Sequence, residues 1–202
     1  MWTRNFKKSS NLFMESMATF TCTELMSFNE FVFYTIIVGM FSLTRPELKQ
    51  NVIDSSDVLG AIKEIPECSK NYLFSLYNCD YKKYLISLIE VVDLLSKNRY
   101  LSVHANYYCR EMRIAGFQQF LVSYKSIKIT HMASQFGVSV DFLDNELSNF
   151  IGAGRLYCKI DKVDGIIEAT RLDQKNELYQ NVIKQGDNIL NRIHKLSRVT
   201  DL

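Results

Sequence analysis

The side chains most able to do chemistry are five cysteines and three histidines, and neither set has the spacing of a known site. The cysteines are Cys22, Cys68, Cys79, Cys109 and Cys158, and the histidines are His104, His131 and His194. No two cysteines form a CxxC pair, and no histidine belongs to HExxH or a comparable metal-binding pattern. An odd number of scattered cysteines in a chain of this size is typical of reduced thiols in the cytosol or nucleus. We therefore expect neither a metal nor another cofactor.

The glycines do not indicate a nucleotide or acyl-transfer site either. The sequence has no GxxxxGK[ST] phosphate loop, no GxGxxG and no GxSxG. Its one glycine-rich stretch, GAGR at residues 152–155, follows a predicted helix, whereas a phosphate loop precedes one. Spatially assembled triads leave no local mark, so missing motifs are weak evidence by themselves. Together with the helical pattern, they favour a scaffold with no small-molecule substrate over an enzyme.

Composition is typical of a folded globular protein. The chain has 202 residues, of which 47% are hydrophobic and 23% charged, and its formal net charge is +2. That charge is too small to indicate a nucleic-acid or membrane partner. The uncharged run Phe31–Leu43 is too short for a bilayer crossing, which needs about 17–25 residues. It is predicted to be a buried core helix, and no membrane association is expected.

Residues 8–125 have the pattern of successive amphipathic helices. The segment Tyr81–Lys97 places Leu85, Leu88, Ile89, Val92 and Leu95 on one stripe. A second stripe follows through Ile114, Phe117, Leu121 and Tyr124. Helices that cannot bury their apolar faces alone pack against one another, so the fold class is mainly α, with a repeat-like antiparallel helical array. Gly116 interrupts the second of these helices at a predicted cost of about 1 kcal/mol relative to alanine.

Residues 126–172 change character and predict a winged-helix subdomain. A short helix capped by Thr130 ends before Gly137, which suits a left-handed position, and Ser139 caps a second helix that Gly152 ends. The alternation in residues 155–160 predicts a strand, and Asp164-Gly165 turns it into a β-hairpin with residues 166–170.

Many winged helices bind DNA, but this one lacks the charges to do so. The second helix carries Asp141, Asp144 and Glu146, with no lysine or arginine from Val140 to Ile151. Carboxylates facing a polyanion would repel it, and the counterion release that supplies non-specific affinity would be missing. A nucleic-acid-binding winged helix is therefore the weaker alternative.

Residues 173–202 predict a terminal helix with an apolar stripe at its surface. The stripe contains Val182, Ile189, Ile193 and Leu196. It lies beyond any domain that it obviously completes, so the helix either folds back onto its own chain or joins helices of other chains in a bundle.

A helical array, a winged helix and a terminal helix in this order resemble the PCI domain family, found in the proteasome lid, the signalosome and a translation initiation factor. The stretches that carry the resemblance, and that favour the proteasome members, are TFTCTELMSFNEFVFYT, RPEL, YLFSLYNCDY, YCREMRIAGFQQFLVSYKS, MASQFGVSVDFLDNELSNFIGAGRLYCKIDKVDGIIEAT and ILNRIHKLSRV. The likeness covers residues 8–202. Such proteins usually carry a long N-terminal region of helical repeats, so we expect a shortened member, with a PCI domain at residues 8–172.

The resemblance implies a non-catalytic subunit of the proteasome regulatory lid, in cytoplasm and nucleus, whose partners are other PCI subunits. A PCI subunit of the signalosome or initiation factor is the alternative. Such subunits pack side by side through their hairpin edges and gather their terminal helices into one bundle. The implied contact residues are Tyr157, Lys159, Ile166 and Ile167 in the hairpin, and Val182, Ile189, Ile193 and Leu196 in the terminal helix.

Overall fold

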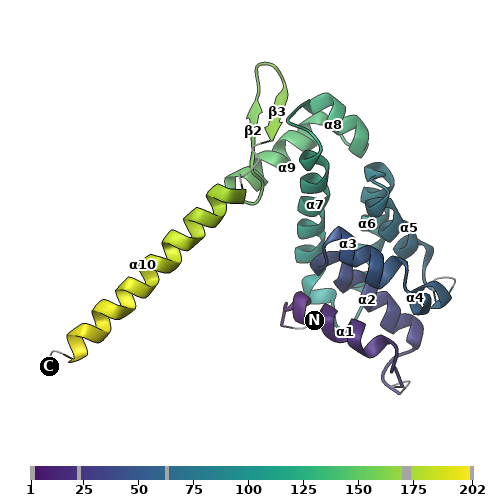
Figure 1. Ribbon diagram of the computed structural model, residues 1–202. Coiled ribbons are helices and arrows are strands. Elements are labelled where there is room, and N and C mark those ends of the chain that lie inside the picture. The colour runs from purple at the N-terminus through teal and green to yellow at the C-terminus, as the bar shows by residue number, and fades with distance from the viewer. Residues whose placement is uncertain (1–2, 22–23, 62–63, 170–173, 201–202) are drawn as a thin grey trace.

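The computed structural model describes residues 3–21, 24–61, 64–169 and 174–200 (Figure 1). A body of packed helices leads into a winged helix, and a long terminal helix projects away from both. The predicted fold class is confirmed: a mainly helical chain with one small antiparallel sheet.

The array comprises helices of very different lengths. In chain order they are α1 (Phe6–Met17), α2 (Phe28–Ser42), α3 (Arg45–Leu48), a π-helical turn η1 (Lys49–Ile53), α4 (Ser56–Ala61), α5 (Glu67–Tyr77), α6 (Tyr81–Ser96), a 3₁₀ turn η2 (Ser102–His104) and α7 (Ala105–Val122). Antiparallel neighbours pack in sequence, α1 on α2, α5 on α6 and α6 on α7.

Helix α2 is the buried core helix that its uncharged sequence predicts. It begins with a capping box, in which the Ser27 hydroxyl accepts from the Glu30 backbone N–H and the Glu30 carboxylate accepts from the Ser27 backbone N–H. From Phe31 to Met40 every residue except Phe33 is buried. A helix that is apolar on all sides needs neighbours on all sides, which explains its central position in the array.

The predicted stripe of α6 is partly wrong. Leu88 and Leu95 lie in the core, but so do Tyr84 and Val91, whereas Ile89 is 62% exposed. One aromatic side chain, Tyr84, and one β-branched side chain, Val91, thus share the core face, which is rotated about the helix axis relative to the predicted aliphatic stripe.

The winged helix contains a strand that the sequence does not indicate. Its elements are β1 (Ser126–Lys128), α8 (Ile129–Phe136), α9 (Val140–Gly152), β2 (Cys158–Asp161) and β3 (Ile166–Ala169), and the antiparallel sheet has the order β1-β3-β2. The hairpin β2–β3 is the predicted one, and β1 is added to it on the far side of β3.

The predicted helix ends of the winged helix are mostly correct. Gly137 has φ 68°, the left-handed conformation expected past the end of α8, and the Ser139 hydroxyl accepts from the Phe142 backbone N–H as the cap of α9. The Thr130 cap is wrong, because the cap position is Lys128, two residues earlier, and it makes no side-chain cap bond.

The last helix, α10 (Gln174–Thr200), extends outward from the end of the sheet (Figure 1). At the N-terminal end of the chain, α1 lies against α2 at the far end of the array.

Two hydrophobic cores share α6 and α7. The array core contains Tyr84 and Leu88 of α6 with Met112 of α7, and the winged-helix core contains Tyr81 of α6 with Phe117 of α7. The pair of helices therefore joins the two parts of the molecule through continuous packing.

Gly116 lies where these two helices come closest. A Cβ placed on Gly116 would be 3.0 Å from Cε1 of the Tyr84 ring. The ring has little room to move, because its hydroxyl donates to the Met112 carbonyl at 2.8 Å and its face stacks on Tyr72. The glycine is thus a close-packing requirement, and the simple helix-propensity reading of Gly116 is wrong.

We predict that Gly116→Ala lowers the free energy of unfolding by about 1–2 kcal/mol, because overpacking outweighs the gain in helix propensity. Gly60→Ala, in helix α4 with open space around the position, serves as the matched control and should be neutral or stabilising by up to about 1 kcal/mol. Urea denaturation of both variants tests this. Equal stabilisation by both would show that the contact with Tyr84 is not limiting.

Candidate protein-interaction surfaces

The side chains able to ligate a metal or act as nucleophiles are dispersed over the described part of the chain. Among the described residues, no group of three His, Cys, Asp or Glu side chains is close enough to hold a metal ion. The described cysteines, Cys68, Cys79, Cys109 and Cys158, are free thiols, and Cys22 lies outside the described residues. Burial raises the pKa of the Cys109 and Cys158 thiols, which keeps them neutral and poorly nucleophilic. No helix in the described ranges is long and apolar enough to cross a membrane.

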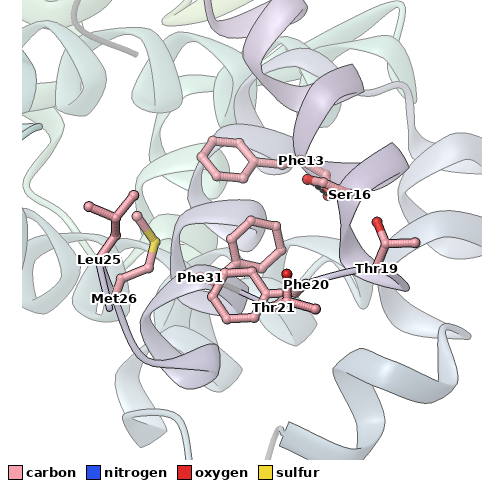
Figure 2. A pocket seen from close by; sticks show the side chains of 8 residues that line it. All are labelled: Phe13, Ser16, Thr19, Phe20, Thr21, Leu25, Met26 and Phe31. Carbon is pink, nitrogen blue, oxygen red and sulfur yellow. Dashed lines mark hydrogen bonds between the residues drawn. The ribbon is translucent and has the colours of Figure 1, made fainter. Parts of the chain in front are cut away.

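A hollow of about 270 Å³ opens between the end of α1 and the start of α2 (Figure 2). Its walls include the rings of Phe13, Phe20 and Phe31, with Met26 beside them. The Ser16 hydroxyl at its edge donates to the Leu12 carbonyl at 2.7 Å and is not paired with a base there. The hollow therefore offers apolar contact and no arrangement for nucleophilic chemistry.

The acidic face predicted for α9 is largely neutralised within the molecule. The Lys162 ammonium of the wing lies 3.0 Å from the Asp144 carboxylate, and the Arg113 guanidinium of α7 lies 2.9 Å from the Glu146 carboxylate. Both carboxylates are mostly buried, with 27% of the Asp144 side chain and 19% of the Glu146 side chain exposed, and neither is a freely solvated charge. These ion pairs hold α9 against α7 and the wing, so two of its three predicted carboxylates are paired within the molecule.

A third ion pair holds the start of the hairpin segment. The Arg155 guanidinium contacts the largely buried Glu111 carboxylate of α7, and the Gln118 side-chain amide donates to the Arg155 carbonyl at 2.9 Å. These partners are 37 and 44 residues apart in sequence, so no local spacing could have revealed them. They set the position of β2 relative to α7.

The structure separates the four hairpin candidates into two kinds. Ile166 and Ile167 belong to β3, the central strand, which pairs with neighbours on both sides, and the Ile167 side chain is fully buried. Tyr157 and Lys159 are exposed, the former by 59%, and lie just before and within β2, an outer strand. An added strand can pair with β2 or β1 but not with β3, so Ile167 is a core residue and not a surface contact.

The four candidates in α10 lie on one exposed stripe. Their exposed fractions are 57% for Val182, 57% for Ile189, 53% for Ile193 and 65% for Leu196. Ile183 and Leu190, similarly exposed, widen the stripe to two apolar residues in the heptad 182–188 and three in the heptad 189–195. A two-stranded coiled coil needs two per heptad, whereas a helix in a bundle presents about three. The stripe therefore fits more than one neighbouring helix.

We predict that the double substitution Ile189→Asp and Ile193→Asp leaves the isolated chain folded, with an unchanged midpoint of thermal unfolding. The reason is that both side chains are already more than half exposed, so the new charges are solvated. Circular dichroism and gel filtration measure this, with Asn188→Asp and Asn191→Asp on the polar face as the matched control. Loss of folding in the first variant alone would show that α10 packs on its own body.

Three segments of the chain match known families. Residues 83–171 match the PCI domain, residues 1–51 match 26S proteasome subunit RPN7, and residues 179–199 match the C-terminal helix of the 26S proteasome regulatory subunit RPN7/PSMD6. The stretch that resembles the PCI domain thus takes in most of α6, all of α7, α8 and α9, and the three-stranded sheet.

Relatives from plants and yeast identify the kind of PCI protein that the chain resembles. The chain is 50% identical over all 202 residues to 26S proteasome non-ATPase regulatory subunit 6 of Oryza sativa subsp. japonica, covering 52% of that protein. It is also 50% identical over its full length to the Arabidopsis thaliana homolog, and 42% identical over 195 residues to 26S proteasome regulatory subunit RPN7 of Saccharomyces cerevisiae, covering 52% and 46% of them. The chain spans about half the length of the curated relatives it matches.

The comparisons agree with the resemblance expected from the sequence, and they do not favour a nucleic-acid-binding winged helix. The absence of any cation along α9 between Val140 and Ile151 gives the same answer on physical grounds.

Proposed function

We propose that this chain is a non-catalytic structural subunit of the proteasome regulatory lid, which supports ubiquitin-dependent protein degradation by holding other subunits in place. The observation that carries the proposal is the exposed apolar stripe of α10, in a segment that matches the C-terminal helix of a proteasome regulatory subunit. An apolar stripe this long is covered in a working protein, and its heptad pattern specifies helices as the cover.

Two separate surfaces would bind the other subunits. Residues 173–202 would enter a bundle with helices of other lid subunits through Val182, Ile189, Ile193 and Leu196. Residues 8–172 would act as one PCI domain, in which the outer strand β2, with Tyr157 and Lys159 beside it, pairs edge to edge with the winged helix of a neighbouring PCI subunit. Ile166 would support that contact from the central strand. The continuous packing through α6 and α7 supports treating residues 8–172 as a unit.

The proposed role needs no cofactor, no small-molecule substrate and no catalytic residue. It also gives the compartments, cytoplasm and nucleus, in which a proteasome lid would operate. The signalosome and the translation initiation factor remain less well supported, because the relatives found are proteasome subunits by name.

The test is co-purification of the tagged chain with proteasome lid subunits. We expect the unmodified chain and the Asn188→Asp, Asn191→Asp control to recover lid subunits, and the Ile189→Asp, Ile193→Asp variant to lose them, because a charge inside a helical bundle is not tolerated. Failure of the unmodified, folded chain to recover any lid subunit would contradict the proposal. So would equal recovery by the two double variants.

A further inference from the structure

A pocket of about 340 Å³ lies at the junction of the array and the winged helix, away from β2 and α10. Leu85 and Leu88 of α6, Phe136 at the end of α8 and Val138 of the following turn contribute to its walls. Its volume falls at the lower end of the range found for small-ligand pockets, about 300–1,000 Å³. Cavities lined in this way bind the apolar part of a ligand.

The mouth of the pocket is apolar and exposed. Ile86, Ile89 and Phe142, which are on its rim, are 54%, 62% and 42% exposed. Ile89 occupies a position where the sequence predicts a core residue, and the fold gives it no partner that buries it. Burial of these side chains against a ligand would stabilise a complex by about 25 cal/mol for each Å² of apolar surface removed from water.

Two cationic side chains, Lys82 and Arg113, line the pocket, and only Arg113 has an ion-pair partner among the described residues. The Arg113 guanidinium is paired with Glu146 at 2.9 Å, and burial raises the pKa of the Cys109 thiol, so that neither carries an uncompensated charge. Lys82 takes part in none of the ion pairs found in the described part of the chain. Its side chain runs along Gly137, where an added Cβ would lie 3.0 Å from the lysine Cγ, so the stem forms part of the wall.

We propose that this pocket binds a small apolar carboxylate, with the hydrocarbon body between α6 and Phe142 and the carboxylate at the Lys82 ammonium. The charge argues against helix α10 of a second copy as the occupant. Between Leu178 and Arg198 that helix carries four cations, Lys184, Arg192, Lys195 and Arg198, against the single carboxylate Asp187. A cationic helix does not complement a pocket whose uncompensated charge is positive.

The experiment is a titration of the full ¹⁵N-labelled chain with decanoate, below its micelle-forming concentration, followed by amide NMR shifts. We expect saturable shifts for residues around the pocket, and binding at least about threefold weaker for decylammonium, which has the same body and the opposite charge.

Three variants locate the site. Phe142→Ala should raise the dissociation constant for decanoate about tenfold through lost apolar contact, and Lys82→Gln about threefold through lost charge. Lys83→Gln, one residue away and paired with Asp80, is the matched control and should leave it unchanged. Thermal unfolding of each variant separates a ligand contact from a structural role of Lys82 at the end of α8.

Either of two outcomes would overturn the proposal. One is the absence of saturable binding at millimolar decanoate, or shifts confined to α10. The other is binding that Phe142→Ala and Lys82→Gln leave unchanged in chains that remain folded.

Discussion

The close contact between α6 and α7 at Gly116 is the constraint on which the rest of the structure depends. Because the glycine has no side chain, the Tyr84 ring can lie against α7, and its hydroxyl reaches the Met112 carbonyl. Tyr72 then stacks on Tyr84 and shares a hydrogen bond of 2.9 Å with Tyr108, which donates to the Ile37 carbonyl of α2. Burial raises the pKa of all three tyrosines, so their hydroxyls stay protonated donors.

The same two helices carry the winged helix. Beyond Gly116, Phe117 packs on Phe136 and Phe150, and Tyr81 packs on Phe120. The ion pairs Arg113–Glu146 and Arg155–Glu111 then fix α9 and the hairpin segment to α7. Both carboxylates are largely shielded from water, and each of the two ion pairs ties a segment of the winged helix to α7 in one orientation. The outer strand β2 is thereby held on a rigid support.

Local sequence signals predicted the parts of the fold that local physics decides. The uncharged run of α2, the left-handed Gly137, the Ser139 cap and the β2–β3 turn each have a short-range cause, and the structure has them. The apolar stripe of α10 was also visible in the sequence, because it repeats with the helical period.

The features that the sequence did not predict depend on long-range contacts. Strand β1 is three residues long with a single buried side chain, Ile127, and it forms only because β3 is beside it. The contacts of Tyr84 with Tyr72 and Gly116 determine which face of α6 is buried, and the aliphatic stripe of α6 does not. Ile89 was therefore wrongly predicted to be buried. Asp144 and Glu146 were expected to form an acidic surface on α9, but both are in ion pairs within the molecule. The central position of β3 likewise removed Ile167 from the surface.

The α10 helix depends on a different balance. A helix with an uncovered apolar stripe has little tertiary packing to stabilise it, and isolated helices are only marginally stable in water. Its amides should therefore open at a far lower free energy than those of α6 and α7, which two cores enclose.

Amide hydrogen exchange of the isolated chain measures this difference most directly. The account predicts rapid exchange throughout Val182–Leu196 and strong protection of Tyr84–Leu95 and Tyr108–Leu121. This is the result expected if α10 is stabilised only by contact with other chains. Protection of the two regions to the same degree, in a chain shown to be monomeric, would mean that α10 is already covered and would contradict the account.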